Sequence, residues 1–408
     1  MGIVVMKFGG TSVATADLLR RAAARAIRAK QQGHDVVVVV SARGHTTDEL
    51  IDLALEITDR PAPRELDQLV SVGEQISIAL MAMAIHAAGH AAISFTGGQV
   101  GLVTDSVHTK ARIRSIDAER IRREFQKGHI VIVAGFQGVD ANLNVTTLGR
   151  GGSDTTAVAL AAALKADVCE IYTDVDGVFT ADPRIVPTAR KIARIACDEM
   201  LELASLGAGV MHSRAVEFGK KYHIPIHVRS SLTDAPGTMI LEEVTGMEQI
   251  AVRGAALSKD LAKVTIRGVP DRPGVAARIF HAIAAANVVV DDIIQNTSRD
   301  GTTDVSFTVA VGDLPGLVAV ARGLVQDLGA LEVLTDDKVS KVSVVGVGMR
   351  THTGVAEAMF RALADARINI QMISTSEIKI SCIIDRESAE RALRVVHEAF
   401  RLGEAAGD

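Results

Sequence analysis

The chain has 408 residues, which is enough for two or three domains. Its 44 lysines and arginines against 49 aspartates and glutamates give a formal net charge of −5, and aromatic residues make up only 3%. It therefore has no bulk attraction for nucleic acid or an anionic membrane, and few rings on which bases could stack, so neither partner is expected.

Strands and helices are predicted to alternate over the first 240 residues. Apolar runs at residues 4–8, 36–40, 91–95, 130–134, 169–173 and 226–228 predict strands. The five consecutive valines at 36–40 are typical of a strand that is buried on both faces. Helical spacing occurs at residues 17–32, 155–166 and 198–206. This alternation predicts an α/β domain with a largely parallel sheet covered by helices.

An uncharged apolar stretch at residues 76–93 is nearly long enough to cross a membrane. It is rich in alanine and is followed by a glycine-rich turn, so we expect a helix in the protein core. His86 and His90 have the spacing of zinc ligands on a helix, but no acidic ligand is near in sequence, and packing explains them better. The three cysteines are far apart and no signal peptide is apparent, which predicts a cytoplasmic protein.

A second pattern begins after the Pro-Gly-Thr turn at residues 236–238 and occurs twice. Residues 264–267, 275–286, 287–291 and 304–309 predict a strand, a helix and two further strands. The segments at 264–266, 274–276 and 288–290 are repeated at 342–344, 354–356 and 368–370. Two copies of a small β-α-β-β unit are therefore expected after the α/β domain.

The first candidate for chemistry is the sequence KFGGTS at residues 7–12, which leaves a strand and enters a helix. Adjacent glycines let backbone N–H groups approach a phosphate, and the helix N-terminus and Lys7 add positive charge. A lone pair of glycines is more often a simple turn. No Walker A loop is present, and the HRD and DFG sequences of protein kinases are missing.

The second candidate is the sequence TLGRGGSDTT at residues 147–156, which lies between a strand and a helix. Helix capping could account for Ser153 and Asp154. Capping does not account for Arg150 among three glycines. A guanidinium group on such a backbone suits bidentate capture of a carboxylate or a phosphate.

Two further segments follow predicted strands, whose C-terminal ends form the ligand crevice of an open α/β sheet. Residues 41–49 follow the valine strand, and Glu74 precedes the uncharged helix. Glu74 could hold an ammonium group, or it could only complement the helix dipole. Residues 172–184 could receive the base and ribose of a nucleotide, with Arg184 on phosphate, although an ordinary turn has the same composition.

Together these segments resemble, in order and spacing, the aspartokinases of the amino-acid kinase superfamily, and the repeats are similar to the ACT domains of that family. The resemblance implies an amino-acid-kinase-type sheet sandwiched by helices, followed by two ferredoxin-like α+β domains. The implied boundaries are residues 1–243 for the catalytic domain, 264–338 for the first ACT domain, and 250–263 with 339–408 for the second. The implied reaction transfers the γ-phosphoryl group of ATP, with Mg²⁺, to the β-carboxylate of L-aspartate, as a step toward lysine, threonine, methionine and diaminopimelate.

The resemblance also implies roles for single residues. Lys7 would contact the transferred phosphoryl group and the attacking carboxylate, and Asp154 would orient Lys7. ATP would be held by Lys7, Phe8, Gly9, Gly10, Ser41, Thr173, Asp174, Phe179, Asp182 and Arg184. Aspartate would be held by Thr47, Glu74, Arg150, Gly151, Gly152 and Ser153, with Glu74 on the amine and Arg150 on a carboxylate. A carboxylate is already a nucleophile at neutral pH, so positioning and charge neutralisation are sufficient.

The chain departs from the family pattern at four positions. Gly209 stands where many members have lysine, and Phe179 where tyrosine is common. These two changes remove a cation and a hydroxyl group that could contact ATP. Arg43 and His45 stand where the family often has methionine and an aspartate or lysine. None of the four changes the proposed catalytic residues.

The ACT domains imply feedback regulation by lysine, threonine or both. The residues implied for the effector are Asp271, Gly274, Ala276, Asp291, Gln295, Val355, Asn369, Ile370, Ser376 and Glu377. Gln295 and Asn369 are expected at equivalent ends of the two copies. The resemblance further implies an ACT-mediated homodimer, or a hetero-oligomer with a small regulatory subunit made from an internal start at Met247.

Two alternatives stay open. A related kinase could act on glutamate, carbamate or a nucleotide, although the paired ACT domains and the TTDE sequence at residues 46–49 argue against it. A regulatory protein could bind ATP or amino acids without turnover. The presence of both Lys7 and Asp154 argues against that second alternative.

Overall fold

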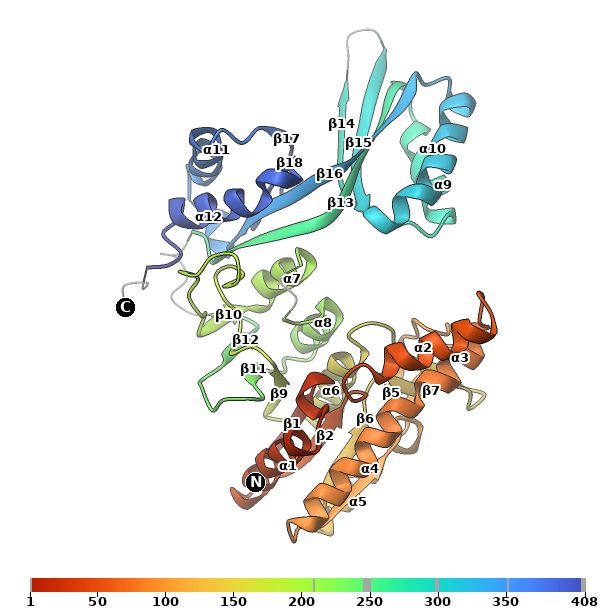
Figure 1. Ribbon diagram of the computed structural model, residues 1–408, viewed down its shortest axis with the longest axis vertical. Coiled ribbons are helices and arrows are strands. Elements are labelled where there is room, and N and C mark those ends of the chain that lie inside the picture. The colour runs from red at the N-terminus through yellow and green to blue at the C-terminus, as the bar shows by residue number, and fades with distance from the viewer. Residues whose placement is uncertain (1, 208–209, 245–250, 298–300, 351, 405–408) are drawn as a thin grey trace. The chain divides into compact units, whose positions relative to one another are not determined.

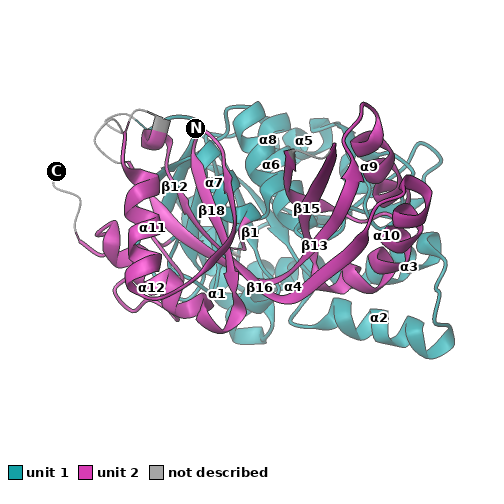
Figure 2. Ribbon diagram, turned by 90° about the horizontal axis from the view of Figure 1, so that it is seen from above, with its two compact units in different colours: residues 1–178, 191–205, 209–245 teal, residues 179–190, 206–208, 246–408 magenta. Residues whose placement is uncertain are grey.

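The computed structural model describes residues 2–207, 210–244, 251–297, 301–350 and 352–404 (Figure 1). The chain forms two compact units, which Figure 2 distinguishes by colour. Unit 1 consists of Met1–Val178, Lys191–Ser205 and Gly209–Thr245, and unit 2 of Phe179–Arg190, Leu206–Ala208 and Gly246–Asp408. The segment Phe179–Arg190, expected inside the catalytic domain, therefore belongs to unit 2.

Unit 1 is built on an eight-stranded sheet. Its strands, in spatial order, are β10 (Arg194–Ala196), β12 (Thr238–Leu241), β11 (Ile226–Ser230), β9 (Val168–Thr173), β1 (Ile3–Phe8), β2 (Asp35–Val40), β6 (Ile130–Ala134) and β3 (Ala92–Phe95). All neighbouring strands run parallel except β11 and β12. The valines of β2 are fully buried because the strand lies inside the sheet and both of its faces are covered.

Helices α1 (Ala16–Gln31) and α4 (Val72–Ala87) cover one face of this sheet, where they pack on alternate residues of β1, β2 and β6. Helix α6 (Gly152–Leu164) contacts β1, β2 and β9, and helices α5 (Glu119–Gln126), α7 (Cys197–Ser205) and α8 (Ser213–Lys221) complete the α/β layers. The cysteines Cys169, Cys197 and Cys382 are free and buried. Burial raises the pKa of each thiol.

The uncharged stretch forms most of α4, which follows α3 (Pro63–Val70) directly. The span Pro63–Ala87 is the one helical stretch of the described chain that is long and apolar enough to cross a membrane, and half of its most apolar window is buried. Ile78, Met81 and Ile85 pack in the core, whereas Ile76 and Met83 are exposed. The helix therefore buries one face in the protein core and exposes the other.

A four-stranded sheet extends unit 1 beside the main sheet. Its order is β5 (Ile113–Ile116), β4 (Leu102–Thr104), β7 (Gln137–Val139) and β8 (Val145–Thr147). Helix α2 (Thr46–Ile57) has no buried residue, and it contacts α3, which in turn contacts β8. Strand β8 leads directly into the glycine-rich loop that precedes α6.

Unit 2 contains a six-stranded sheet in the order β14 (Val290–Thr297), β15 (Thr302–Ala310), β13 (Gly254–Pro270), β16 (Glu332–Val345), β18 (Lys379–Asp385) and β17 (Ile370–Thr375). All of its paired strands are antiparallel. The long strands β13 and β16 run through both halves of the sheet, as Figure 1 shows. A strand was expected at residues 287–291, but strand β14 begins only at Val290. The reason is that Asn287 has a positive φ of 61° and belongs to the turn that ends the preceding helix.

Each half of this sheet has its own pair of helices and its own core. Helices α9 (Val275–Ala285) and α10 (Leu314–Leu328) cover the first half, and α11 (Val355–Asp365) and α12 (Ala389–Ala399) cover the second. Ala181 and Val186, from the segment Phe179–Arg190, are buried in the second core. The side chain of Thr180 forms a hydrogen bond of 2.9 Å with Nε2 of the buried His397.

Candidate active site

The C-terminal ends of four neighbouring parallel strands meet at one edge of the main sheet. The backbone N–H of Gly9 donates to the carbonyl of Tyr172 (3.3 Å), and that of Ser41 donates to the carbonyl of Phe8 (3.1 Å). The N–H of Gly135, directly after β6, donates to the carbonyl of Val40 (3.0 Å). The segments that follow β1, β2, β6 and β9 are therefore held side by side, where open α/β sheets bind their ligands.

An ion pair between Lys7 and Asp154 lies at this edge. Lys7 is in β1, and Asp154 is in the first turn of α6, where the helix dipole favours a negative charge. Their Nζ and Oδ1 atoms are 2.5 Å apart, and only 12% and 13% of the two side chains is exposed. A Cβ at Gly9 would lie 3.6 Å from Nζ, so the ammonium group stands beside the glycine turn.

The glycine turn is pressed against the segment that follows β2. A Cβ at Gly10 would lie 2.7 Å from the carbonyl oxygen of Ala42, so no larger residue fits there. The N–H of Gly44 donates to the carbonyl of Gly10 (3.1 Å). The Arg43 guanidinium group donates to the carbonyl oxygens of Val13 (3.2 Å) and Ala14 (2.7 Å). Arg43, one of the departures, thus ties the two segments together.

Glu74 is a buried carboxyl group with one unused oxygen. It lies in the first turn of α4 with 2% of its surface exposed. Its Oε1 accepts a hydrogen bond from the N–H of Ala42 (3.0 Å), and its buried Oε2 has no partner among the described residues. Loss of solvent raises the pKa of Glu74 to about 7. A role restricted to the helix dipole would leave the buried oxygen unexplained, whereas a bound ammonium group would satisfy it.

The glycine-rich loop before α6 is held closely on both sides. Gly149 and Gly151 have φ angles of 76° and 70°, which favour glycine. A Cβ at Gly151 would collide with the ring of His212, at 2.2 Å. Ser153 packs against Gly135 on the other side, while Arg150 is exposed. The backbone of this loop is therefore fixed, and it presents the Arg150 side chain to solvent.

The comparisons with known proteins agree with this geometry. A model of the amino acid kinase family matches residues 2–230, and ACT domain models match residues 264–325 and 342–400. An aspartate kinase of Stutzerimonas stutzeri is 54% identical over 100% of this chain and 99% of its own length. An aspartokinase of Pseudomonas aeruginosa is 54% identical over 98% of both chains. The chain belongs to the aspartokinase family.

Solved structures of the family have the same fold. The crystal structure of E. coli aspartokinase III in complex with aspartate and ADP has a TM-score of 0.82 at 28% identity, over 97% of this chain and 99% of that one. The same enzyme in complex with lysine and aspartate has a TM-score of 0.77 at 27% identity, over 98% and 99%. The fold class and the kinase activity expected from the sequence are thus confirmed.

The residues expected to hold ATP are divided between the two units. Thr173 and Asp174 follow β9 in unit 1, and the Thr173 hydroxyl donates to Asp174 (3.1 Å). Phe179, Asp182 and Arg184 lie in the unit 2 segment Phe179–Arg190. Asp182 and Arg184 form an ion pair of 2.7 Å, and the hydrogen bond from Arg184 lowers the pKa of Asp182.

Thr47, which is expected to hold aspartate, is half-buried at the start of α2. Gly209 lies outside the described residues.

Four of the residues expected to bind an effector of this aspartokinase lie together. Asp271, Gly274, Ala276 and Gln295 line a cavity of about 330 Å³ at the N-terminal end of α9. The remaining six lie outside it, and Asp291 pairs with Lys341. The expected equivalence of Gln295 and Asn369 is wrong, because Gln295 lies well inside β14 whereas Asn369 precedes β17.

Several residues around the active site were not found from the sequence. Gly135 could have been found, because it directly follows a buried apolar run and therefore lies at the same sheet edge as Lys7. His212 and Arg214 had none, because they approach the glycine-rich loop from a distant part of the chain. The Arg214 guanidinium group donates to the carbonyl oxygens of Leu148 (2.6 Å) and Ala111 (3.2 Å).

Proposed function

We propose that this aspartokinase transfers the γ-phosphoryl group of ATP to the β-carboxylate of L-aspartate at the Lys7–Asp154 pair, giving 4-phospho-L-aspartate. The observation that carries the proposal is the nearly buried ammonium group of Lys7 at the edge of the sheet, next to a turn of two residues that carry no side chains. Two anions must approach each other in this reaction. A fixed cation between them lowers that repulsion without any reorganisation during the reaction.

Asp154 acts on Lys7 rather than on the substrate. Its carboxylate forms an ion pair with the ammonium group and so holds that group at the edge of the sheet. The N–H of Gly9 is already bonded to the carbonyl of Tyr172, but the N–H groups that follow it in the turn can approach the phosphate oxygens, because Gly9 and Gly10 carry no side chains. The attacking carboxylate of aspartate is ionised at neutral pH, so no residue of the chain has to act as a strong base.

Aspartate is recognised by groups of opposite charge. The free Oε2 of Glu74 accepts from the substrate ammonium group, and Arg150 pairs with a carboxylate. Thr47 and Ser153 supply hydroxyl groups, and Gly151 and Gly152 keep the loop close to the substrate. Because Oε2 of Glu74 is buried, a substrate that lacks the amine would leave it without a partner. This arrangement selects an amino acid over a simple diacid.

Magnesium is expected to arrive with the nucleotide. Among the described residues, no group of three His, Cys, Asp or Glu side chains is placed to hold a metal ion. This fits Mg²⁺, which proteins usually bind through one or two carboxylates together with substrate phosphates. When bound, the ion would neutralise phosphate charge.

Hydroxylamine trapping tests the reaction directly, because it converts an acyl phosphate into a stable hydroxamate. With ATP and Mg²⁺, we expect hydroxamate from L-aspartate and at most a trace from L-glutamate. Equal product from glutamate would favour the related kinase. No hydroxamate from either amino acid would favour a regulatory protein without turnover.

We also propose that the cavity beside α9 binds lysine or threonine as an inhibitor. Asp271 lies at its rim, and its carboxylate can pair with the ammonium group of an amino acid. Replacing Asp271 with alanine is expected to raise the inhibitor concentration for half-inhibition at least tenfold, with uninhibited kcat changed less than twofold. Activity titrated against lysine, threonine and their mixture measures this. Asp337→Ala, an exposed acid outside the cavity, is the control, and unchanged titration curves for Asp271→Ala would place the sensor elsewhere.

The ACT domains are further proposed to mediate assembly, as a homodimer or with a small regulatory subunit. The edge strands β14 and β17 carry the exposed apolar side chains Ile293 and Ile373, which a second copy could cover. Met247, the proposed internal start, lies outside the described residues. The mass of the complex in solution, and detection of a second, shorter product in cells, test the two forms of assembly.

A further inference from the structure

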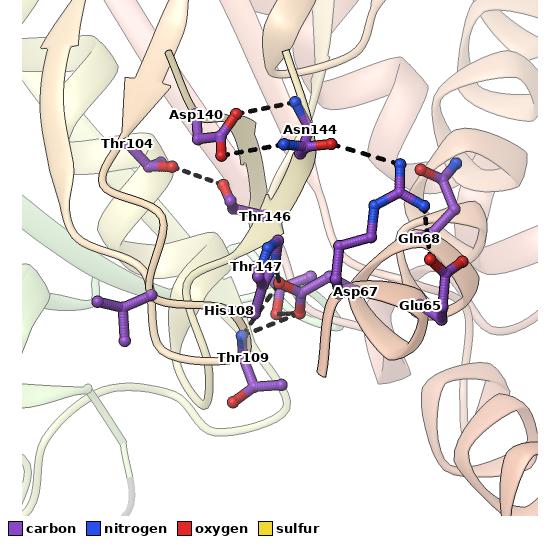
Figure 3. A network of polar contacts seen from close by, with 12 residues as sticks. Glu65, Asp67, Gln68, Thr104, His108, Thr109, Asp140, Asn144, Thr146 and Thr147 are labelled. Atoms are coloured by element: carbon purple, nitrogen blue, oxygen red, sulfur yellow. Dashed lines mark hydrogen bonds and ion pairs between the residues drawn. The ribbon is translucent and has the colours of Figure 1, made fainter. Parts of the chain in front are cut away.

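A second buried carboxylate, that of Asp67, lies close to the glycine-rich loop. Asp67 is in α3 and is completely buried. Its Oδ1 accepts a hydrogen bond from the Thr147 hydroxyl group (2.6 Å), and both of its oxygens accept from the backbone N–H of Thr109 (3.1 and 3.0 Å). Nδ1 of His108 lies 2.8 Å from Oδ2. Figure 3 shows these groups converging on the carboxylate from different segments of the chain.

The partners of Asp67 belong to the two segments that fix the start of the glycine-rich loop. Thr147 is the last residue of β8, and Leu148, Gly149 and Arg150 follow it. The carbonyl oxygen of Thr109 would lie 2.9 Å from a Cβ at Gly149, so the backbone at Thr109 is pressed against that glycine. The N–H of Ala111 donates to the carbonyl of Thr147 (2.9 Å). Asp67 therefore joins the strand that enters the loop to the segment that lies against it.

Arg150 depends on its backbone for its position. Its side chain is exposed, and it lies between glycines that have no side chains to pack. The region that its guanidinium group can reach is thus set by how the backbone leaves β8. A displacement of about 1 Å in a group that binds substrate can lower the rate by as much as 10²-fold.

We propose that Asp67 is a positioning residue for substrate binding, which acts through Thr147 and Thr109 to hold the loop that carries Arg150. This inference rests on the proposed function, in which Arg150 binds a carboxylate of aspartate. Asp67 itself touches no substrate, because its two oxygens are occupied within the protein. Its contribution falls mainly on the aspartate side of the reaction, since its partners hold the start of the glycine-rich loop at Thr147 and Gly149, whereas Asp154, the partner of Lys7, lies beyond the loop in the first turn of α6.

The chain offers a matched pair of substitutions to test this. Thr147→Val removes the hydroxyl group that donates to Asp67. Thr146→Val removes the hydroxyl group of the neighbouring residue, which is also buried in β8. That hydroxyl group is hydrogen-bonded to Thr104 (2.6 Å) and not to Asp67. Both variants lose one buried hydrogen bond and should lower the melting temperature, Thr147→Val more than Thr146→Val, because a hydrogen bond to a carboxylate is stronger than one between two hydroxyl groups.

The kinetics should separate the two variants. We expect Thr147→Val to raise KM for aspartate about tenfold, with KM for ATP and kcat changed less than twofold. Thr146→Val should leave all three unchanged, and Thr147→Ser, which keeps the hydroxyl group, should restore the KM for aspartate. Equal effects of Thr147→Val and Thr146→Val on KM, or an effect of Thr147→Val on melting temperature alone, would overturn the proposal.

A double substitution separates this inference from the function on which it rests. If Arg150 binds aspartate, Arg150→Ala raises KM for aspartate, and adding Thr147→Val raises it no further, because the threonine acts through the arginine. An unchanged KM in Arg150→Ala would refute the proposed role of Arg150 itself. A raised KM in Arg150→Ala with a normal KM in Thr147→Val would refute only the role of Asp67.

Discussion

Replacing Lys7 with alanine is expected to lower kcat about 10³-fold or more while the protein stays folded. The ammonium group stands beside the glycine turn, and its attraction for the transferred phosphoryl group grows as charge develops in the transition state. An interaction made mainly in the transition state lowers kcat and kcat/KM together when it is removed. Steady-state kinetics with both substrates varied measure both quantities.

Removing Lys7 also leaves Asp154 without its ion pair, and the resulting loss of stability has to be separated from the loss of catalysis. The Asp154 carboxylate, 13% exposed, would lose its ion pair but keep the favourable field at the start of α6. We expect a loss of about 1–3 kcal/mol in the free energy of unfolding. Lys30→Ala is the matched control, because Lys30 pairs with Asp35 at 3.0 Å in the same unit and is also partly buried. It should change stability slightly and kcat not at all.

A conservative substitution sharpens the test. Lys7→Arg keeps the charge, but the planar guanidinium group is larger than an ammonium group and cannot occupy the same space beside Gly9. We expect kcat to remain at least tenfold below that of the unchanged protein. A kcat within tenfold of normal in Lys7→Ala, with the protein folded, would show that the phosphoryl group is transferred elsewhere.

The active-site edge is predictable because it follows from the parallel direction of the strands. Each buried apolar run ends in small or polar residues, and parallel strands bring those ends together. The structure agrees with this expectation, since Phe8 at the end of β1 is paired with Val40 at the end of β2 and with Tyr172 near the end of β9. Knowing that the apolar runs form parallel strands is therefore sufficient to place Lys7, Ser41 and Thr173 at one edge.

The Lys7–Asp154 pair was expected only from the family resemblance, and the ion pair agrees with that expectation. Other closing contacts could not be predicted, because they join residues far apart in the chain. The fit of His212 on Gly151 and the network around Asp67 both depend on how helices pack on the sheets. No local spacing encodes such contacts. The same reason explains why the segment Phe179–Arg190 was not expected in unit 2, since the burial of Ala181 and Val186 in the core beneath α12 has no signature in their own segment.

Replacing Glu74 with glutamine is expected to raise KM for aspartate about 100-fold. The amide oxygen can still accept from the N–H of Ala42, but the amide nitrogen would then present hydrogens to the substrate ammonium group. Removing one partner of a buried, hydrogen-bonded charge pair costs about 2–5 kcal/mol in binding, which sets the size of the effect. Initial rates at saturating ATP give the KM.

The pH dependence of binding distinguishes this role from a structural one. Because burial raises the pKa of Glu74 from 4.5 to about 7, the free enzyme carries a protonated Glu74 below pH 7 and cannot pair with the amine. Thus kcat/KM for aspartate should fall about tenfold per pH unit below pH 7. The profile of Glu74→Gln should be flat in this range once the titration of ATP, which both proteins share, is divided out.

Stability should change in the opposite direction to binding. A carboxyl group whose pKa is raised on folding stabilises the folded state fully at pH values below 4.5, and this contribution is lost as the pH rises to about 7. Glu74→Gln should therefore be at least as stable as the unchanged protein at pH 8, although its KM is far higher. Glu65→Gln is the control, because Glu65 is an exposed acid in the first turn of α3, and removing its charge affects only the helix dipole and an exposed ion pair with Arg64. If Glu65→Gln and Glu74→Gln raised KM equally, or if the pH profile of Glu74→Gln matched that of the unchanged protein, Glu74 would not be the residue that holds the substrate amine.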